Sequence, residues 1–252
     1  MDVDFSAISQ ERPFGRFLRL PLRLLPSWLV VPILQGPLRG QRWIVGAATH
    51  GCWLGSYELS KQKTMASLVR PGDVVYDLGA NVGFYTLLAS AGVGPTGQVH
   101  AFEPLPENVR FLQRHVQLNR LENVFVHECA VSDSGGLNRF AAAASRCQGR
   151  LSPRGELSVR TVKLDDFVFN DGHRLPHLIK IDVEGGEIRA LCGARQVLAQ
   201  GRSLVLLATH GPEAHSECCA LLKSLDYRIT ALEGESPETS SELLARPLPL
   251  EQ

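Results

Sequence analysis

Residues 74–86 read Val74-Val-Tyr-Asp-Leu-Gly-Ala-Asn-Val-Gly-Phe-Tyr-Thr86 and contain the strongest structural signal in the chain. The apolar run at the start is typical of a buried strand, and Phe84 to Ala91 predicts a helix. Gly79, Asn81 and Gly83 lie between the two and predict a tight strand-to-helix turn. Ligands of open α/β sheets bind outside the carboxyl ends of the strands, so this turn is a candidate binding site. An ordinary strand-to-helix connection is the alternative.

Three residues in or beside this turn have properties that suit a ligand. Gly79 has no Cβ, which predicts a close approach of the backbone to a ligand. Asn81 tolerates the left-handed backbone conformation that a tight turn uses. Asp77 places a carboxylate just before the turn, where its charge would repel a pyrophosphate and favour an ammonium or sulfonium group.

A second acidic residue, Glu103, lies about 20 residues beyond the glycine turn, at the end of the next predicted strand. A carboxylate in that place can accept both hydroxyls of a ribose, which predicts a nucleoside site. The dinucleotide fingerprint GxGxxG has three glycines, whereas this chain has Gly79-x-Asn81-x-Gly83 and lacks the third. The pattern therefore favours S-adenosylmethionine over NAD.

Strands and helices alternate along the rest of the chain. The sequence predicts strands at 98–102, 124–127, 178–183 and 204–208, and helices at 58–70, 107–119, 187–199 and 213–225. The stretch 132–161 is loop-rich with weak strands. Such alternation indicates a doubly wound, mostly parallel α/β sheet with helices on both faces.

A second chemical cluster is Lys180-Ile-Asp182-Val-Glu184, at the end of a predicted strand. Alternate residues of a strand share a face, so Lys180, Asp182 and Glu184 lie on one side. We expect Asp182 to orient the acceptor or act as a base, with a lysine–carboxylate ion pair as the alternative. His210 ends the next strand and could take a proton from a hydroxyl, or could be a structural hydrogen-bonding residue. Asp182, Glu184 and His210 could hold Mg²⁺, but nothing in their spacing requires it, so we predict no metal site.

The 252 residues suit one α/β domain with extensions. Residues 1–70 predict an N-terminal arm, 71–232 the main domain and 233–252 a mostly flexible tail. Within the tail, 243–250 could dock or add an edge strand, although two prolines weaken that prediction. In the arm, 41–46 and 50–57 suggest a hairpin. Trp43, His50, Trp53 and Tyr57 form either a small satellite core or a substrate lid.

Composition narrows the class of protein. Lys and Arg number 26 and Asp and Glu 26, and a neutral chain argues against a dedicated nucleic-acid binder. The six cysteines contain no CxxC pair, which argues against a zinc site or a disulfide framework and indicates a cytoplasmic protein. The apolar-rich stretch 17–34 contains Arg19, Arg23 and three prolines, which disfavours a spanning helix but leaves membrane-surface association open.

These motifs together resemble the FkbM family of class I methyltransferases. The resemblance covers about residues 73–210 and is carried by Asp77-Leu-Gly-Ala-Asn-Val-Gly-Phe-Tyr-Thr86, Ala101-Phe-Glu-Pro-x-Pro-Glu-Asn108, Ala130-Val-Ser132 and Ile179-Lys-Ile-Asp-Val-Glu-Gly-Gly-Glu187. It implies a Rossmann-like fold. It also implies methyl transfer from S-adenosylmethionine, commonly to a hydroxyl on a sugar, glycolipid or polyketide.

The resemblance also implies roles for individual residues. Asp77, Gly79 and Gly83 would line the methionine end of the cofactor, and Glu103 would hold its ribose. Ala130, or Asp133 just beyond it, would lie near the adenine edge, and Asp182 would lie beside the reacting methyl group. The family often has a Glu near the end of the fifth strand, whereas this chain reads Leu207-Ala-Thr-His210. The groups on the acceptor side therefore differ from the family pattern.

We expect an O-methyltransferase that acts on a small molecule, possible acceptors being a carbohydrate or glycolipid. A noncatalytic S-adenosylmethionine-binding or scaffold protein on the same fold is the alternative, since fold does not fix function. A nicotinamide oxidoreductase is a distant third. Nothing in the sequence indicates an oligomeric state.

Overall fold

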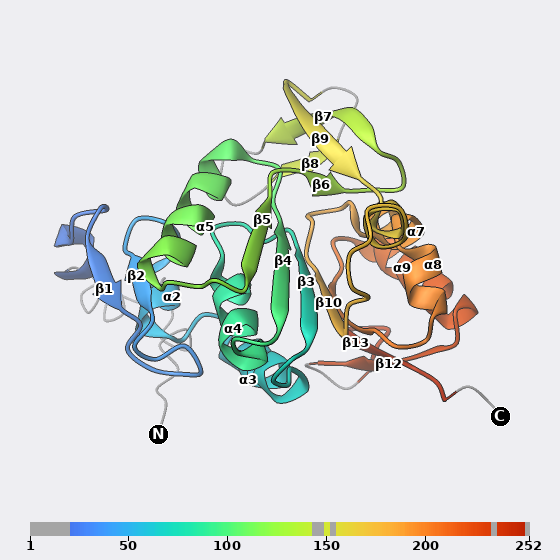
Figure 1. The fold of residues 1–252 in the computed structure, drawn as a ribbon, viewed down its shortest axis with the longest axis horizontal. Helices are drawn as coiled ribbons and strands as arrows, with labels where there is room; N and C mark the ends of the chain where they lie inside the picture. The colour runs from blue at the N-terminus through green and yellow to red at the C-terminus, as the bar shows by residue number, and fades with distance from the viewer. Residues whose placement is uncertain (1–20, 143–148, 152–154, 233–235, 250–252) are drawn as a thin grey trace.

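A seven-stranded sheet forms the centre of the molecule (Figure 1). The structure is a computed structural model and describes residues 21–142, 149–151, 155–232 and 236–249. The strand order is β12-β13-β11-β10-β3-β4-β5. The strands span Val74–Leu78 (β3), Gln98–Phe102 (β4), Val124–His127 (β5), Leu178–Ile181 (β10), Leu204–Ala208 (β11), Tyr227–Ala231 (β12) and Glu242–Pro247 (β13). The run from β5 through β4, β3 and β10 to β11 pairs in parallel, which confirms the predicted doubly wound, mostly parallel sheet.

Helices cover both faces of this sheet, because successive strand residues point to opposite sides. Val75 belongs to a core that includes Met65 and Leu87, whereas Tyr76 faces the opposite core and contacts Phe167. The first face carries α3 (Leu59–Leu68), α4 (Phe84–Val93) and α5 (Pro106–Leu118), and the second carries α6 (Leu164–Phe169), α7 (Glu187–Gly193), α8 (Arg195–Ala199) and α9 (Pro212–Ser224).

The helix predicted over residues 187–199 is divided into α7 and α8. The backbone at Ala194 leaves the helical region, with φ −110 and ψ 11. The residue before it, Gly193, packs so closely on the second face that a Cβ would lie 2.0 Å from the carbonyl oxygen of Ser132. Tertiary packing therefore interrupts a segment whose local pattern is helical throughout.

A second, four-stranded sheet lies at one end of the central sheet (Figure 1). It comprises β6 (Ala130–Val131), β7 (Gly136–Ala142), β8 (Gly149–Leu151) and β9 (Leu157–Val162), in the order β6-β9-β7-β8. The sequence predicts this region only as loop-rich with weak strands. Its small, polar and basic residues give little hydrophobic alternation, so the local signal is weak.

The predicted hairpin in the arm is wrong in its pairing. β2 (Arg42–Ile44) is a strand, but it pairs antiparallel with the earlier strand β1 (Val30–Pro32). Residues His50–Leu54 form a short helix, α2, which ends at Gly55 in the left-handed conformation. Residues 50–57 contain no β-branched side chain, so their strand propensity is low despite the aromatic residues.

Two side chains at the C-terminal end of α5 form hydrogen bonds with the backbone of β2. Asn119, which follows the helix, accepts a hydrogen bond from the Arg42 N–H (2.7 Å) and donates one to the Arg42 carbonyl (2.9 Å). One turn earlier, His115 accepts from the Ile44 N–H (3.1 Å) and donates to the Val82 carbonyl (2.8 Å). Trp43 stacks on His115 and is fully buried. The arm from β1 to α3 thus shares a hydrophobic core with the central sheet.

The expected flexible tail contributes an inner strand instead. β13 lies between β11 and β12 and is antiparallel to both. Leu243 and Ala245 are fully buried in the sheet core, and the two prolines do not interrupt the pairing because Pro247 is the last residue of the strand. The prediction of a mostly mobile tail is therefore wrong for residues 242–247.

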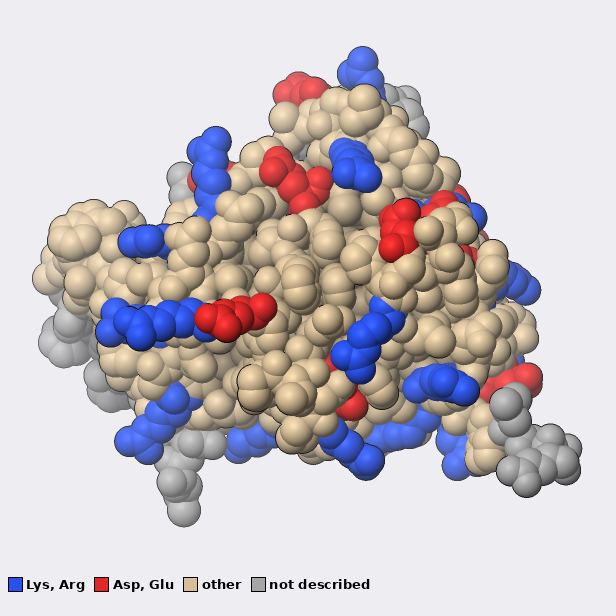
Figure 2. Space-filling model, viewed as in Figure 1, with Lys and Arg blue, Asp and Glu red and all other residues tan. Residues whose placement is uncertain are grey.

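The segment expected to contact a membrane surface, 17–34, lies partly outside the described residues. Within 21–34, the side chains of Leu24 (82% exposed), Trp28 (75%) and Leu34 (51%) face solvent. Among the described residues there is no helix with the length and apolar character needed to cross a bilayer. On the face shown in Figure 2, basic and acidic side chains are interspersed over the surface.

Candidate active site

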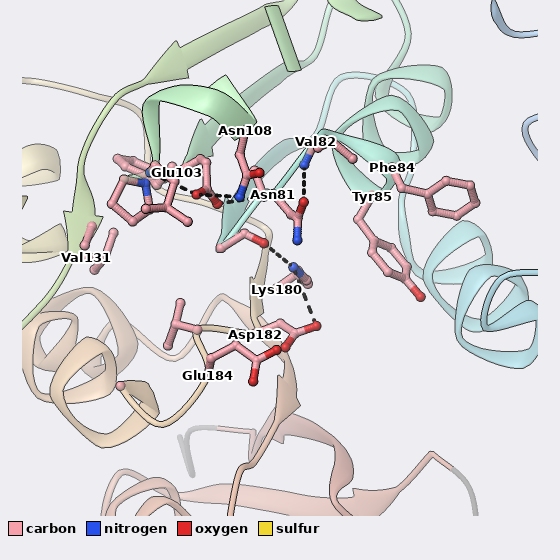
Figure 3. Close-up of a pocket in the computed structure, with 18 of the residues that line it drawn as sticks. Asn81, Val82, Phe84, Tyr85, Glu103, Asn108, Val131, Lys180, Asp182 and Glu184 are labelled. Atoms are coloured by element: carbon pink, nitrogen blue, oxygen red, sulfur yellow. Dashed lines mark hydrogen bonds and ion pairs between the residues drawn. The ribbon is translucent and has the colours of Figure 1, made fainter. Parts of the chain in front are cut away.

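One pocket opens at the carboxyl ends of β3, β4 and β10, where binding was predicted. It encloses about 1130 Å³ including its open mouth. Figure 3 shows Glu103 and Asn108 on one side of this space and Asp182 and Glu184 on another. The second sheet closes an apolar end with Ala130, Val131 and Phe140, and the arm and α4 contribute Ala48, Tyr57, Phe84 and Tyr85.

The turn after β3 has the backbone conformation expected from its residues. Gly79, Asn81 and Gly83 have φ values of 73°, 51° and 98°. Asn81 thus adopts the predicted left-handed conformation. Gly79 lines the pocket, but a Cβ there would lie 1.9 Å from the carbonyl oxygen of Asp182. Contact between the ends of β3 and β10, rather than ligand approach alone, therefore requires glycine at position 79. Gly83 does not line the pocket; it is the N-cap of α4 and packs against Leu112.

The Glu103 carboxylate is held rigidly at the pocket wall. Its Oε2 accepts from the backbone N–H of Asn81 (2.8 Å), and its Oε1 accepts from the N–H of Leu105 (3.0 Å) and from Asn108 Nδ2 (3.1 Å). Burial raises the pKa of Glu103, while these hydrogen bonds act in the opposite direction. A carboxylate fixed by three donors keeps further lone pairs for a ligand.

Asp77 lies beneath the pocket instead of lining it. Its carboxylate is fully buried, accepts a hydrogen bond from Thr86 Oγ1 (2.7 Å) and pairs with Lys180 Nζ (3.1 Å). The expectation that Asp77 faces the ligand directly is therefore wrong, because a fully buried carboxylate needs its own partners. Its charge acts on the pocket through Lys180, which also donates to the Gly79 carbonyl (2.9 Å) and lines the pocket (Figure 3).

Two ammonium groups hold Asp182 in its ionised form. Its Oδ2 lies 3.9 Å from Lys180 Nζ and 3.6 Å from Lys61 Nζ. Burial alone would raise the pKa of Asp182, but Lys180 and Lys61 outweigh it and hold the pKa below its ordinary value. Lys61 is itself buried and reaches this site from α3, where it also pairs with Glu242 (2.8 Å) and Glu58 (3.6 Å).

His210 is brought to the other oxygen of Asp182, as its place at the end of β11 predicts. Its Nδ1 hydrogen-bonds Glu187 Oε1 at 2.8 Å, and its Nε2 lies 3.4 Å from Glu184 and 3.9 Å from Asp182. The hydrogen bond to Glu187 raises the pKa of His210. Glu184 has a left-handed backbone, φ 54°, which directs the chain sharply away from β10.

The two residues expected near an adenine edge, Ala130 and Asp133, lie in different places. Ala130 lines the pocket, whereas Asp133 is exposed and forms an ion pair with Arg189 at 2.9 Å. Asp133 thus lies away from the pocket lining. Of the four residues in the predicted aromatic cluster, Tyr57 reaches the pocket, and Trp43 and Trp53 are buried in the core.

Sequence reasoning missed the charged groups that surround Asp182 from other parts of the chain. Lys61 and Glu58 come from the start of α3, Glu242 from β13 and Glu187 from α7. Tyr85, which lines the pocket, donates a hydrogen bond to Glu58 at 2.6 Å, and its ring lies 5.4 Å from Lys61 Nζ. Glu187 lies within the quoted motif and could have been considered for its position beside Asp182; the others carry no local signal.

Comparison with known proteins gives consistent results. The family model for the methyltransferase FkbM domain matches residues 77–229. The 31-O-demethyl-FK506 methyltransferase FkbM of Streptomyces tacrolimicus is 31% identical over 193 residues, which cover 57% of this chain and 74% of that protein. The hexuronic acid methyltransferase AglP of Haloferax volcanii is 27% identical over 164 residues, covering 64% of this chain and 66% of that protein.

A solved structure shares the fold. The crystal structure of methyltransferase FkbM from Methylobacillus flagellatus KT superimposes with a TM-score of 0.52 at 19% identity, over 73% of this chain and 50% of that one. This chain therefore spans about half the length of that protein. The likeness supports the predicted Rossmann-like class I methyltransferase fold.

Proposed function

Because this chain belongs to the FkbM methyltransferase family, we propose that it transfers a methyl group from S-adenosylmethionine to a hydroxyl of a small molecule. One observation carries the proposal: a single pocket has a fixed carboxylate suited to a ribose on one side and a carboxylate cluster on the other. Two substrates bound in such a pocket would meet between Glu103 and Asp182.

The residues that line the pocket fit S-adenosylmethionine. Glu103 would accept the ribose hydroxyls, and the apolar end formed by Ala130, Val131 and Phe140 would take the adenine. The turn at Gly79 and the ionised Asp182 would face the amino-acid and sulfonium end, where negative charge is favourable. The bound cofactor supplies an electrophilic methyl group.

The protein's part in the reaction is to position the acceptor and manage its proton. The transfer forms a carbon–oxygen bond and breaks the carbon–sulfur bond, while the acceptor hydroxyl loses its proton. Asp182 and Glu184 line the pocket and His210 lies beside them, with one ligand atom of each within 4.8 Å of the others, so these residues would orient that hydroxyl and take up its proton. Alignment of the two reactants in one pocket accounts for much of the expected rate acceleration.

A hydroxyl on a sugar, glycolipid or similar natural product is the acceptor that we favour. Tyr57, Phe84 and Tyr85 line the wall nearest the arm, and aromatic faces suit sugar rings and apolar chains. The two curated relatives are described as acting on 31-O-demethyl-FK506 and on a hexuronic acid, which are both compatible with such a pocket.

The test combines cofactor binding with product formation. Glu103→Gln should weaken S-adenosylmethionine binding by about 2 kcal/mol or more in calorimetry, because charge-assisted hydrogen bonds to the ribose are lost. Glu122→Gln, at an exposed position, is the matched control. Formation of S-adenosylhomocysteine should then be measured with sugars, uronic acids and glycolipids as acceptors. Unchanged affinity in Glu103→Gln would remove the nucleoside assignment, and cofactor binding without product across the panel would favour a noncatalytic binding protein.

A further inference from the structure

The three acceptor-side residues are arranged like a set of metal ligands. One ligand atom from each of Asp182, Glu184 and His210 lies within 4.8 Å of the others. Ligand atoms around an octahedral cation with bonds of about 2.1 Å lie about 3.0 Å apart when adjacent and about 4.2 Å apart when opposite, so small side-chain rotations would bring these three groups to a common ion. Asp182 and Glu184 also line the pocket, so a cation held here would be accessible to a ligand.

A buried carboxylate fixes the orientation of the imidazole. Glu187 is fully buried, its Oε1 binds His210 Nδ1 at 2.8 Å, and its Oε2 has no hydrogen-bond partner among the described residues. A carboxylate accepts, so Nδ1 carries a proton, and Nε2 faces Asp182 and Glu184. Histidine ligands of metals are oriented in this way by carboxylates. Two carboxylates beside Nε2 call for positive charge there, which a bound cation or a proton on Nε2 would supply.

The charged groups around this site are also mostly negative. Six carboxylates are connected by ion pairs or hydrogen bonds in this region, against the two ammonium groups of Lys61 and Lys180. The carboxylates are Glu58, Asp77, Asp182, Glu184, Glu187 and Glu242. Six carboxylates thus outnumber the two ammonium groups and the one imidazole in a partly buried cluster, which favours a further cation here.

We propose that Asp182, Glu184 and His210 bind a divalent cation of the Mg²⁺ or Mn²⁺ type, with Glu187 holding the imidazole in place. Two carboxylates with one imidazole suit these ions, and water or an acceptor oxygen would complete the coordination. Resting here on the proposed methyl transfer, the cation would also bind the acceptor hydroxyl and lower its pKa, which favours loss of its proton.

Binding of Mn²⁺ to the full chain, followed by electron paramagnetic resonance without cofactor or acceptor, tests the site directly. We expect one bound Mn²⁺ per chain, displaced by excess Mg²⁺. Glu184→Gln and His210→Gln should each weaken Mn²⁺ binding by at least about tenfold, while the exposed control Glu217→Gln should not. Circular dichroism confirms that each variant is folded. Absence of bound Mn²⁺ in the wild type, or equal affinity in all variants, would overturn the proposal and indicate that a proton on His210 supplies the missing charge.

This test is independent of the proposed reaction, because no methyl transfer is measured. A second experiment addresses the role of the cation. Formation of S-adenosylhomocysteine should fall at least about tenfold after treatment with EDTA and recover on addition of Mg²⁺ or Mn²⁺. Full activity in EDTA would refute the catalytic role of the cation and leave the methyltransferase proposal standing.

Discussion

Lys61 shows how a single buried side chain supports the site from a distant part of the sequence. Burial lowers the pKa of its ammonium group, but Asp182, Glu58 and Glu242 together reverse that effect and raise the pKa. Its neighbours are all carboxylates, so its removal would leave negative charges close together with less compensation. The Lys61 ammonium group therefore connects α3 to the end of β10 through Asp182 and to β13 through Glu242.

We predict that Lys61→Met lowers the free energy of unfolding by about 3–5 kcal/mol, the usual cost of removing one partner from a buried ion pair. The double variant Lys61→Met/Glu242→Gln should recover part of this loss, because it removes one of the stranded charges. Urea unfolding of both, with the exposed Lys63→Met as control, measures the effect. Equal stability of Lys61→Met and wild type would mean that water or ions compensate the cluster.

At Asp182 the prediction concerns activity. Asp182→Asn keeps the size of the side chain but removes its charge, so kcat should fall at least about 10²-fold, with a modest loss of cofactor affinity because Asp182 would be only one of several groups that hold the cofactor. Single-turnover formation of S-adenosylhomocysteine, with cofactor affinity from calorimetry, separates the two effects. Wild-type turnover in this variant would exclude Asp182 from the reaction.

Among the helices, α5 has two roles, one at each of its ends. Its first turn meets Glu103 at the pocket through Asn108, and its C-terminal end holds β2 through His115 and the capping residue Asn119. His115 also donates to the carbonyl of Val82, which belongs to the turn that lines the pocket. The arm and the turn after β3 are therefore held by the same imidazole, which must remain neutral to accept from Ile44.

This imidazole makes stability depend on pH. Burial lowers the pKa of His115 from 6.5 to about 4, so the unfolded chain takes up a proton that the folded protein does not. Stability present above pH 6.5 should fall as the pH decreases towards 4, by up to about 3 kcal/mol for a shift of this size. Urea unfolding at pH 7, 6 and 5 should show a steeper decline for wild type than for His115→Gln. Parallel declines would show that His115 titrates equally in both states.

The success of element prediction depended on how local the signal was. β3, β4, β5 and β11 have the predicted bounds, because each is a short, mostly apolar run of the length of a strand. β1, β13 and the helix in residues 50–54 were missed or misassigned, because their conformation is set by partners far away in sequence. In the site, Asn81 and Glu103 could be found from the motif, whereas Lys61 and Glu242 are 181 residues apart and meet only in the folded chain.

For the whole molecule, the most consequential feature is the strand from the C-terminal region. β13 lies between β11 and β12 and pairs with both, so these two strands have no direct pairing with each other in the described sheet. It also carries Glu242 to Lys61 beside the pocket. The described part of the tail thus belongs to the same domain as the pocket.

Deletion of residues 236–252 should therefore abolish cooperative unfolding. Removal of β13 uncovers one edge each of β11 and β12. It also exposes the apolar core side chains that share a cluster with Leu243. We expect loss of the near-ultraviolet circular dichroism signal and binding of a hydrophobic dye. A truncated chain that melts cooperatively and binds S-adenosylmethionine normally would contradict this.

The position of β13 also imposes an order on assembly during synthesis. β10, β11 and β12 leave the ribosome before β13, yet β13 must enter between the last two of them. The nascent chain therefore waits with unsatisfied strand edges until residue 247 has emerged, and only then can Glu242 reach Lys61. The half of the sheet that contains β3, β4 and β5 is synthesised earlier, so we expect the side of the pocket at Glu103 to form before the side at Asp182.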